Sequence, residues 1–349
     1  MATSIVGVDI GNGVLRAVEV ADAAKPRPTL LRHAEVALPE GAASRGEVLE
    51  PNTVAAALRQ LWSIGGFKSK NVILGMGNQR VLARDLSMPA MSLERIKESL
   101  PFHVQDMLPV PVAEALLDFY PVSHGQGESG PVVNGLLVAA VKDAVLANVR
   151  AAELAGLTPV DVDLIPFALN RVLVTRPRLA GSIALIQIGS STTTVVISVD
   201  GVPHFVRIIP TGGADLTEAL YGGLEIAPHE AEAIKRSLGL ATQVSGPDEQ
   251  RAVEIIYLHA NELLTSLRNT VNYFVNTRAD ARIDGVVLTG GGASLRGLPD
   301  ALAEMTRLPV TTGDPFLGLG LSRSLDADEL RAKRSSLAVA LGLTMGRAA

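Results

Sequence analysis

The sequence predicts an α/β fold built from two related halves, with a smaller α+β unit inserted between them. An apolar strand that breaks at a glycine-rich turn and resumes as a second strand occurs twice, around Gly11 and around Gly189. A similar order of strands and helices follows each turn, and such repetition indicates a duplicated unit. With 349 residues, 47% of them hydrophobic, the chain is long enough for two cores.

The first half is expected to contain three strands, a helix and a further strand. The helix is predicted where apolar residues recur at helical spacing, and the strands where short apolar runs end at glycine. In chain order the predicted elements are Ser4–Ile10, the turn Gly11-Asn12-Gly13, Val14–Val20, Leu30–Leu38, the helix Val54–Ser63 and the strand Asn71–Met76.

The second half repeats this order with additional helices. Asp200-Gly201 is a hairpin signal between two of its strands, and Pro228 suits the first turn of a helix. The predicted strands are Ile183–Ile188, Thr192–Val199, His204–Ile209 and Gly285–Leu288, and the predicted helices are Asp215–Tyr221, Pro228–Leu238, Ala252–Phe274 and Leu298–Glu304.

The region between the halves is predicted to be a small α+β unit, and Arg176-Pro177-Arg178 is a plausible linker after it. Its elements are the strands Val81–Leu86, Glu114–Tyr120 and Val132–Val141, the helices Leu93–Met107 and Lys142–Ala155, and a turn at Gly125–Gly130. We expect residues 1–78 and 165–178 to form the first core, 79–164 the inserted unit, and 179–349 the second core with a helical insertion at about 214–280. An apolar helix at Ser335–Leu343 is expected to pack back on a domain.

Residue usage argues against several functions. The formal net charge of −5 argues against a nucleic-acid partner, which demands a basic face. The chain has no cysteine, its six histidines are scattered, and no Gly-x-Ser-x-Gly motif is present. We therefore assign no catalytic residue and expect no metal site made of protein ligands alone. Without a long apolar run or a signal-like start, a cytoplasmic location is expected.

The two glycine turns have the composition of phosphate-binding turns. A phosphate needs several converging donors, and small residues let backbone N–H groups approach it closely. The first is Asp9-Ile10-Gly11-Asn12-Gly13, and the second is Gln187-Ile188-Gly189-Ser190-Ser191-Thr192. Either one alone is explained as an ordinary hairpin turn. Their equivalent places in a duplicated unit favour the phosphate interpretation.

A third glycine run, Gly290-Gly291-Gly292, precedes Ala293 and Ser294 and follows a buried strand. Three successive glycines leave no side chain between the backbone and a flat ring or a ribose, whereas a tight strand-to-helix turn seldom requires three. No Walker A motif occurs, and no Gly-x-Gly-x-x-Gly opens a helix after the first strand, so neither a P-loop nor a Rossmann site is predicted.

These motifs, in this order, resemble the actin/Hsp70/sugar-kinase superfamily. Within it the chain is similar to the PilM family of type IV pilus assembly proteins, itself similar to the division protein FtsA. The resemblance covers nearly the whole chain. Beyond the glycine turns it rests on Val18-Glu19-Val20, Pro109-Val110-Pro111, Asp314-Pro315-Phe316 and the apolar stretch Ala338–Leu343. It implies an actin-like fold of two ribonuclease H-like βββαβα units with an FtsA-type inserted subdomain.

The resemblance also implies a site for ATP and Mg²⁺. Asp9 would bind the Mg²⁺ shell, because a hard carboxylate suits that ion. Glu232 and Lys235 would contact ribose and adenine, although a solvated helix face explains them equally well. Gly212 and Gly213 would line the far side of the phosphates. The full set of expected nucleotide-binding residues is Asp9, Gly11, Asn12, Gly13, Gln187, Gly189, Ser190, Ser191, Thr192, Gly212, Gly213, Glu232, Lys235, Gly290, Gly291, Gly292 and Ser294.

Gln187 departs from the family pattern, which usually has an acidic residue in the second phosphate turn. A carboxylate there can organise Mg²⁺ or the attacking water, whereas a neutral amide does so poorly. The sequence therefore predicts tight ATP binding with slow or absent hydrolysis.

The implied partner is the cytoplasmic N-terminal peptide of a PilN-like inner-membrane protein, bound beside the inserted unit. The protein would then be a scaffold held at the inner membrane through this and other pilus assembly components, with self-association as a further possibility. Two alternatives stay open: an FtsA-like filament protein of cell division, and a small-molecule kinase or ATPase of the same fold.

Overall fold

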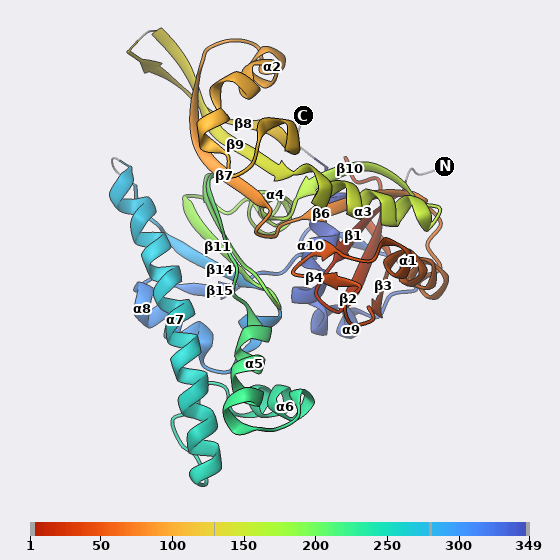
Figure 1. The fold of residues 1–349 in the computed structure, drawn as a ribbon, viewed down its shortest axis with the longest axis vertical. Helices are drawn as coiled ribbons and strands as arrows, with labels where there is room; N and C mark the ends of the chain where they lie inside the picture. Colours follow the sequence, from red (N-terminus) through yellow and green to blue (C-terminus); the bar gives the residue numbers. More distant parts are fainter. Residues whose placement is uncertain (1–3, 129, 279–280, 347–349) are drawn as a thin grey trace.

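The computed structural model describes residues 4–128, 130–278 and 281–346, which form two mixed sheets and a smaller antiparallel sheet (Figure 1). The first sheet has the strand order β10-β6-β1-β2-β3-β16. Strands β1, β2 and β3 are antiparallel neighbours, whereas β6 and β10 run parallel to β1. Their bounds are β1 Ser4–Ile10, β2 Val14–Ala21, β3 Thr29–Ala37, β6 Asn71–Met76, β10 Thr158–Leu164 and β16 Gly320–Leu321.

The second sheet repeats this topology with the order β13-β12-β11-β14-β15. Strands β11, β12 and β13 are antiparallel, and β14 and β15 continue the sheet in parallel. The expected duplication is therefore present in space. The bounds are β11 Ser182–Ile188, β12 Thr193–Val199, β13 Val202–Ile209, β14 Gly285–Thr289 and β15 Val310–Thr312.

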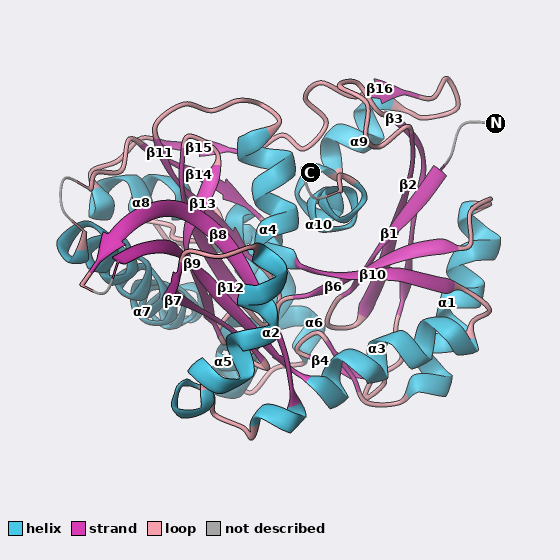
Figure 2. Ribbon diagram, turned by 90° about the horizontal axis from the view of Figure 1, so that it is seen from above, coloured by secondary structure: helices cyan, strands magenta, loops and turns pink. Residues whose placement is uncertain are grey.

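Helices cover both sheets and separate them. Helices α1 (Pro51–Gly65) and α3 (Lys142–Leu154) pack together against one face of the first sheet, and α10 (Arg334–Thr344) covers the other. Figure 2 shows α10 and α4 (Ile165–Asn170) between the two sheets. Helices α7 (Pro247–Thr277) and α8 (Leu298–Thr306) cover the outer face of the second sheet.

The remaining elements are a helical cluster and the inserted unit. Helices α5 (Gly213–Leu224) and α6 (Pro228–Leu238) pack on the first turns of α7 around a small apolar core. At the other end of the molecule, strands β7 (Val81–Pro89), β9 (Gly130–Val141) and β8 (Ala115–Gly127) form a three-stranded sheet with α2 (Leu93–His103) (Figure 1). The short elements are β4 Ala43–Ser44, β5 Glu47–Val48, α9 Ala327–Ala332, one turn of π-helix at Arg171–Thr175 and 3₁₀ turns at Gln105–Met107, Val112–Glu114 and Gly291–Ser294.

Three segments lie elsewhere than the sequence analysis placed them. Helix α3 and strand β10 were expected in the inserted unit, but β10 is the edge strand of the first sheet and α3 packs on α1. Residues 320–344 were expected in the second core, but β16 pairs with β3, and α10 is buried on β1 and β2. Strand and helix periodicity gives no information about which sheet an element joins, because β pairing is non-local.

The contact between α10 and the first sheet depends on Gly7. A Cβ at this position would lie 1.9 Å from the backbone oxygen of Ala340 in α10. We expect Gly7→Ala to destabilise the protein by about 1–3 kcal/mol, because α10 must shift to make room. Gly222, in α5, is the matched control, since a Cβ there meets nothing within 4 Å. Gly222→Ala should be neutral or stabilising by up to about 1 kcal/mol, and equal losses in urea unfolding would contradict this account.

Candidate functional site

A cavity of about 1200 Å³ lies between the two halves, and the three glycine turns meet in its lining. All the residues predicted to bind nucleotide line this cavity except Gly13. Gly13 adopts a φ of +78° and shapes the first turn without reaching the cavity. The duplicated topology explains the convergence, because the β1–β2 turn and the β11–β12 turn occupy equivalent ends of their sheets.

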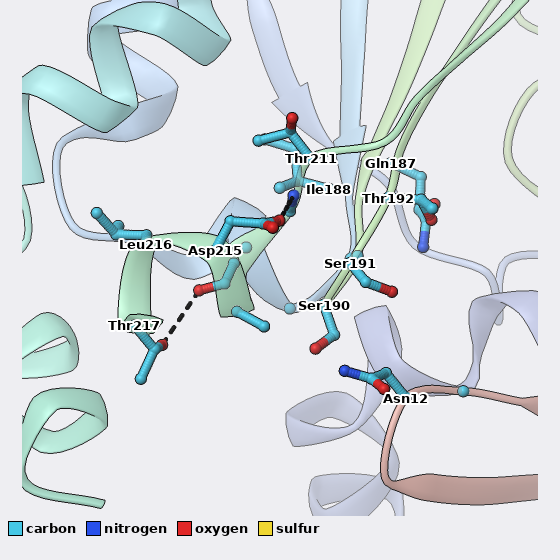
Figure 3. Close-up of a pocket in the computed structure, with 18 of the residues that line it drawn as sticks. Asn12, Gln187, Ile188, Ser190, Ser191, Thr192, Thr211, Asp215, Leu216 and Thr217 are labelled. Atoms are coloured by element: carbon cyan, nitrogen blue, oxygen red, sulfur yellow. Dashed lines mark hydrogen bonds between the residues drawn. The ribbon is translucent and has the colours of Figure 1, made fainter. Parts of the chain in front are cut away.

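The first turn is closed by a hydrogen bond from the backbone N–H of Gly11 to the oxygen of Val14, at 2.9 Å. A Cβ on Gly11 would lie 3.1 Å from that same oxygen, so a small residue is needed there. The turn is exposed at Asn12, whose side chain points towards Ser190 of the second turn in Figure 3. Each half thus contributes polar groups to one space.

The second turn is fixed to the start of α5. The N–H of Gly189 donates to the oxygen of Thr192 at 2.8 Å, which closes the turn. The N–H groups of Gly213 and Ala214 then donate to the oxygens of Gly189 and Ser190, at 2.9 and 2.7 Å. A Cβ on Gly212 would lie 2.5 Å from the oxygen of Ser190, so the close approach requires glycine.

The third glycine run packs over the end of β11. Gly290 has a φ of +89°, and a Cβ there would lie 2.3 Å from the backbone oxygen of Ile188. A Cβ on Gly292 would lie 2.3 Å from the Ile188 side chain, whereas one on Gly291 would meet nothing within 4 Å. Two of the three glycines are therefore required by packing on β11, and the middle one faces open space.

Glu232 and Lys235 of α6 line the same cavity and bind each other, with Nζ and Oε2 2.5 Å apart. The Lys235 ammonium also donates to the Gly213 oxygen at 2.9 Å and to Thr217 Oγ1 at 2.7 Å. Burial alone would raise the pKa of Glu232, but hydrogen bonds from Lys235, Thr217 and Arg236 outweigh it and leave the pKa below its ordinary value. These contacts join α6 to α5, the helix whose first residues hold the second turn.

Asp9, at the end of β1, is a buried carboxylate in this cavity. Burial raises the pKa of Asp9 above its ordinary value, and Arg16, 3.9 Å away, lowers it only in part. Arg16 pairs on its other side with Glu35, at 3.4 Å. Sequence reasoning missed Arg16, although its position directly opposite Asp9 on the paired strand β2 would follow from the hairpin register.

The equivalent position in the second half holds no charge. Gln187 lies at the end of β11, directly paired with Thr194 on β12 and Thr289 on β14. The hydroxyl oxygens of these two threonines are buried and have no hydrogen-bond partner among the residues that the structure describes. The equivalent strand ends therefore differ: β1 brings a carboxylate to the cavity, whereas β11 brings the neutral amide of Gln187.

The remaining chemistry of the chain is sparse. Within residues 4–128, 130–278 and 281–346, no group of three or more His, Asp or Glu residues is arranged to hold a metal ion. No helix in the same residues is long and apolar enough to cross a membrane.

Sequence reasoning also missed Arg45 and Asp215, two cavity residues that pair across the cleft at 3.2 Å.

Two sheets of the same topology, with a cleft where three glycine turns meet, define an actin-like fold. The structure is similar to that of a PilM–PilN type IV pilus biogenesis complex, with a TM-score of 0.87, 27% identity and coverage of 99% of this chain and 98% of that one. It is also similar to MreB5 of Spiroplasma citri bound to AMPPNP, with a TM-score of 0.56, 12% identity and coverage of 98% and 95%.

Sequence comparison agrees with these structural similarities. The cell division protein FtsA of Bacillus subtilis is 25% identical over 204 residues, which are 54% of this chain and 46% of that protein. The chain spans about half the length of the FtsA relatives it matches in B. subtilis, Borreliella burgdorferi and Neisseria meningitidis. Residues 7–348 match the family of the type IV pilus assembly protein PilM. The chain belongs to this family.

The burial of Asp9 predicts a cost in stability. A carboxyl whose pKa is raised in the folded protein destabilises it at neutral pH, and this penalty disappears as the pH falls through the raised pKa. We expect Asp9→Asn to raise the Tm of the nucleotide-free protein by a few degrees at pH 7.5. The difference should shrink at pH 4.5. A lower Tm for the variant at pH 7.5 would contradict the assignment.

Proposed function

We propose that this protein is an ATP-binding scaffold of type IV pilus assembly that retains its nucleotide and hydrolyses it slowly or not at all. The observation that carries the proposal is the convergence of three glycine turns on one cleft, with Asp9 at the end of β1 and the neutral Gln187 at the equivalent position of β11. Backbone N–H groups of the two hairpin turns suit phosphates, and the open face at Gly291 suits the nucleoside.

The residues present fit Mg²⁺ as a companion of the nucleotide. This ion commonly takes one or two protein carboxylates and fills its shell with phosphate oxygens and water. Asp9 is such a carboxylate, and its raised pKa is the signature of a buried charge that lacks full compensation. When bound, Mg²⁺ would offset phosphate charge, and Arg16 beside Asp9 would add a second positive group.

Binding is tested with a fluorescent ATP analogue in the presence of Mg²⁺. We expect saturation at micromolar concentration in the wild type. Gly290→Ala should weaken binding at least tenfold, because its Cβ would displace the third turn from Ile188. Gly41→Ala is the matched control: Gly41 also has a positive φ, of +79°, but a Cβ there meets nothing within 4 Å, and it lies outside the cavity lining. No binding at millimolar nucleotide would refute the proposal.

Slow turnover is attributed to the missing carboxylate at position 187. Gln187→Asp should raise phosphate release from pre-bound ATP by about tenfold or more, since a positioned base contributes about 10²-fold at least when geometry is ideal. Gln187→Asn is the matched control, because it shortens the side chain equally without adding charge. If both variants release phosphate at the wild-type rate, another feature limits hydrolysis.

The scaffold role is supported by the similarity to the PilM–PilN complex over nearly the full length of both chains. We propose that this protein binds the cytoplasmic N-terminal peptide of a PilN-like inner-membrane protein and is thereby held at the membrane from the cytoplasm. Saturable binding of that peptide, measured calorimetrically, with a scrambled peptide as control, tests this role. Sugar-dependent ADP production would instead indicate a kinase, and ATP-dependent sedimentation would indicate an FtsA-like filament.

A further inference from the structure

A two-residue hairpin in the first half carries an arginine at an unfavourable backbone position. Strands β4 and β5 are joined by Arg45-Gly46, with φ values of +51° and +77°. A type I′ turn requires positive φ at both residues and is normally built from Asn-Gly or Gly-Gly. The left-handed region costs a long side chain about 1 kcal/mol. Arg178 and Arg307 also adopt positive φ, so the role of Arg45 is inferred from the contacts of its guanidinium.

The base of this hairpin is fixed to the first half. The side-chain amide of Asn78 donates to the oxygen of Gly46 at 3.3 Å, and the N–H of Val48 donates to Asn148 Oδ1 at 3.3 Å. Glu47 pairs with Arg80 at 3.3 Å. The tip therefore has a stable base, and a displacement of Arg45 relative to the second half reports a movement between the halves.

From this base the Arg45 side chain crosses to the second half. Its Nη1 donates to the oxygen of Pro210 at 3.0 Å and to that of Ser191 at 3.4 Å. Its Nη2 donates to Asp215 Oδ1 at 3.2 Å. These acceptors belong to the second glycine turn, the segment after β13 and the first turn of α5. The planar guanidinium of arginine can donate to acceptors on several segments at once, whereas the single ammonium of lysine cannot reach all of them.

Asp215 links this contact to the geometry of the second turn. Its other oxygen, Oδ2, accepts the N–H of Gly212 at 2.6 Å and so fixes the start of α5. The next two N–H groups of that helix hold the oxygens of Gly189 and Ser190. Figure 3 shows Asp215 beside the turn that carries Ser190 and Ser191. Arg45 therefore reaches its partners only when the halves are close and the turn is assembled.

We propose that Arg45 is a closure latch that holds the two halves together over a bound nucleoside triphosphate and slows its release. The inference rests on the proposed nucleotide site and adds to it a residue that controls retention. Arg45 acts as a positioning residue, since the contacts described are all to protein acceptors. The contact is partly exposed, with side-chain exposures of 39% for Arg45 and 27% for Asp215, so a moderate effect is expected.

The test uses Arg45→Asn. Asn-Gly is the dipeptide preferred in a type I′ turn, so the variant keeps the hairpin, but its side chain is too short to contact the second half. We expect the dissociation rate of a fluorescent ATP analogue to rise about two- to fivefold. Arg45→Lys keeps the charge without the fork and should also accelerate release. Arg307→Asn is the matched control, because Arg307 has a φ of +58° and lies outside the cavity lining at the end of α8. It should leave the rate unchanged.

A second readout measures closure without nucleotide. Because the chain has no cysteine, Gln60→Cys on α1 and Asn272→Cys on α7 give one exposed spin label in each half. In the nucleotide-free protein, Arg45→Asn should shift the inter-label distances to longer and broader values, whereas Arg307→Asn should not. A loss of hairpin folding would appear instead as a lower Tm, which the Asn-Gly turn is chosen to avoid.

The outcomes separate the latch from the nucleotide proposal. Unchanged distances and an unchanged release rate in Arg45→Asn, with the wild type binding nucleotide, overturn the latch alone. Altered distances in a protein that binds no nucleotide support the latch as a clamp between the halves and refute the nucleotide site. Faster release together with longer distances supports both.

Discussion

The end of strand β11 is the point on which the geometry of the cleft depends. Gly290 and Gly292 pack against Ile188 so closely that no Cβ fits, and Gly212 approaches Ser190 in the same way. Backbone thus lies on backbone from two directions around one hairpin turn. These contacts require glycine at each position, and they place the second turn, the start of α5 and the third turn within one rigid unit. The second glycine turn is therefore held by packing on both of its neighbours.

The first half lacks an equivalent constraint around its turn. The turn at Gly11 is closed by one hydrogen bond within the hairpin, and Asn12 at its tip is exposed. Charged side chains lie there instead. Asp9, Arg16 and Glu35 form a chain of ion pairs across three strands, and these side chains are buried or half-buried. The two halves therefore share a topology but hold their glycine turns differently. The second turn is held by close backbone packing, whereas the first lies beside a chain of charged side chains.

Much of this could be predicted from the sequence, because the decisive signals are local. Apolar runs ending in glycine located the strands on either side of both turns, and the order of elements indicated the duplication. The cavity contains every predicted site residue except Gly13, which shapes its turn from outside. Their role in binding nucleotide stays a prediction. Glu232 and Lys235 pair with each other in the cavity lining, which a reading of the helix alone could not distinguish from a solvated face.

What escaped prediction is non-local. Strand β10 follows the inserted unit in sequence, but it completes the first sheet by pairing with β6, more than 80 residues earlier. Helix α10 is apolar around most of its surface and is buried on the first sheet, although it follows the second. Arg45 stands in a turn with no motif of its own. Its partner Asp215 lies 170 residues away, so only the fold brings the pair together.

The return of the C-terminal segment to the first half gives the two halves a second connection besides the α4 region. Helix α10 packs on β1 at Gly7, contacts β2, and lies against α4, the helix that leads from the first sheet to the second. The chain thus passes between the halves twice on the same side of the cleft, while the glycine turns and Arg45 meet in the cavity itself. A double connection at one side restricts relative motion of the halves to opening and closing about that side. The Arg45 contacts cross the cavity itself, and Arg278 of the second half also pairs with Asp85 of the inserted unit, at 2.7 Å and outside the cavity lining.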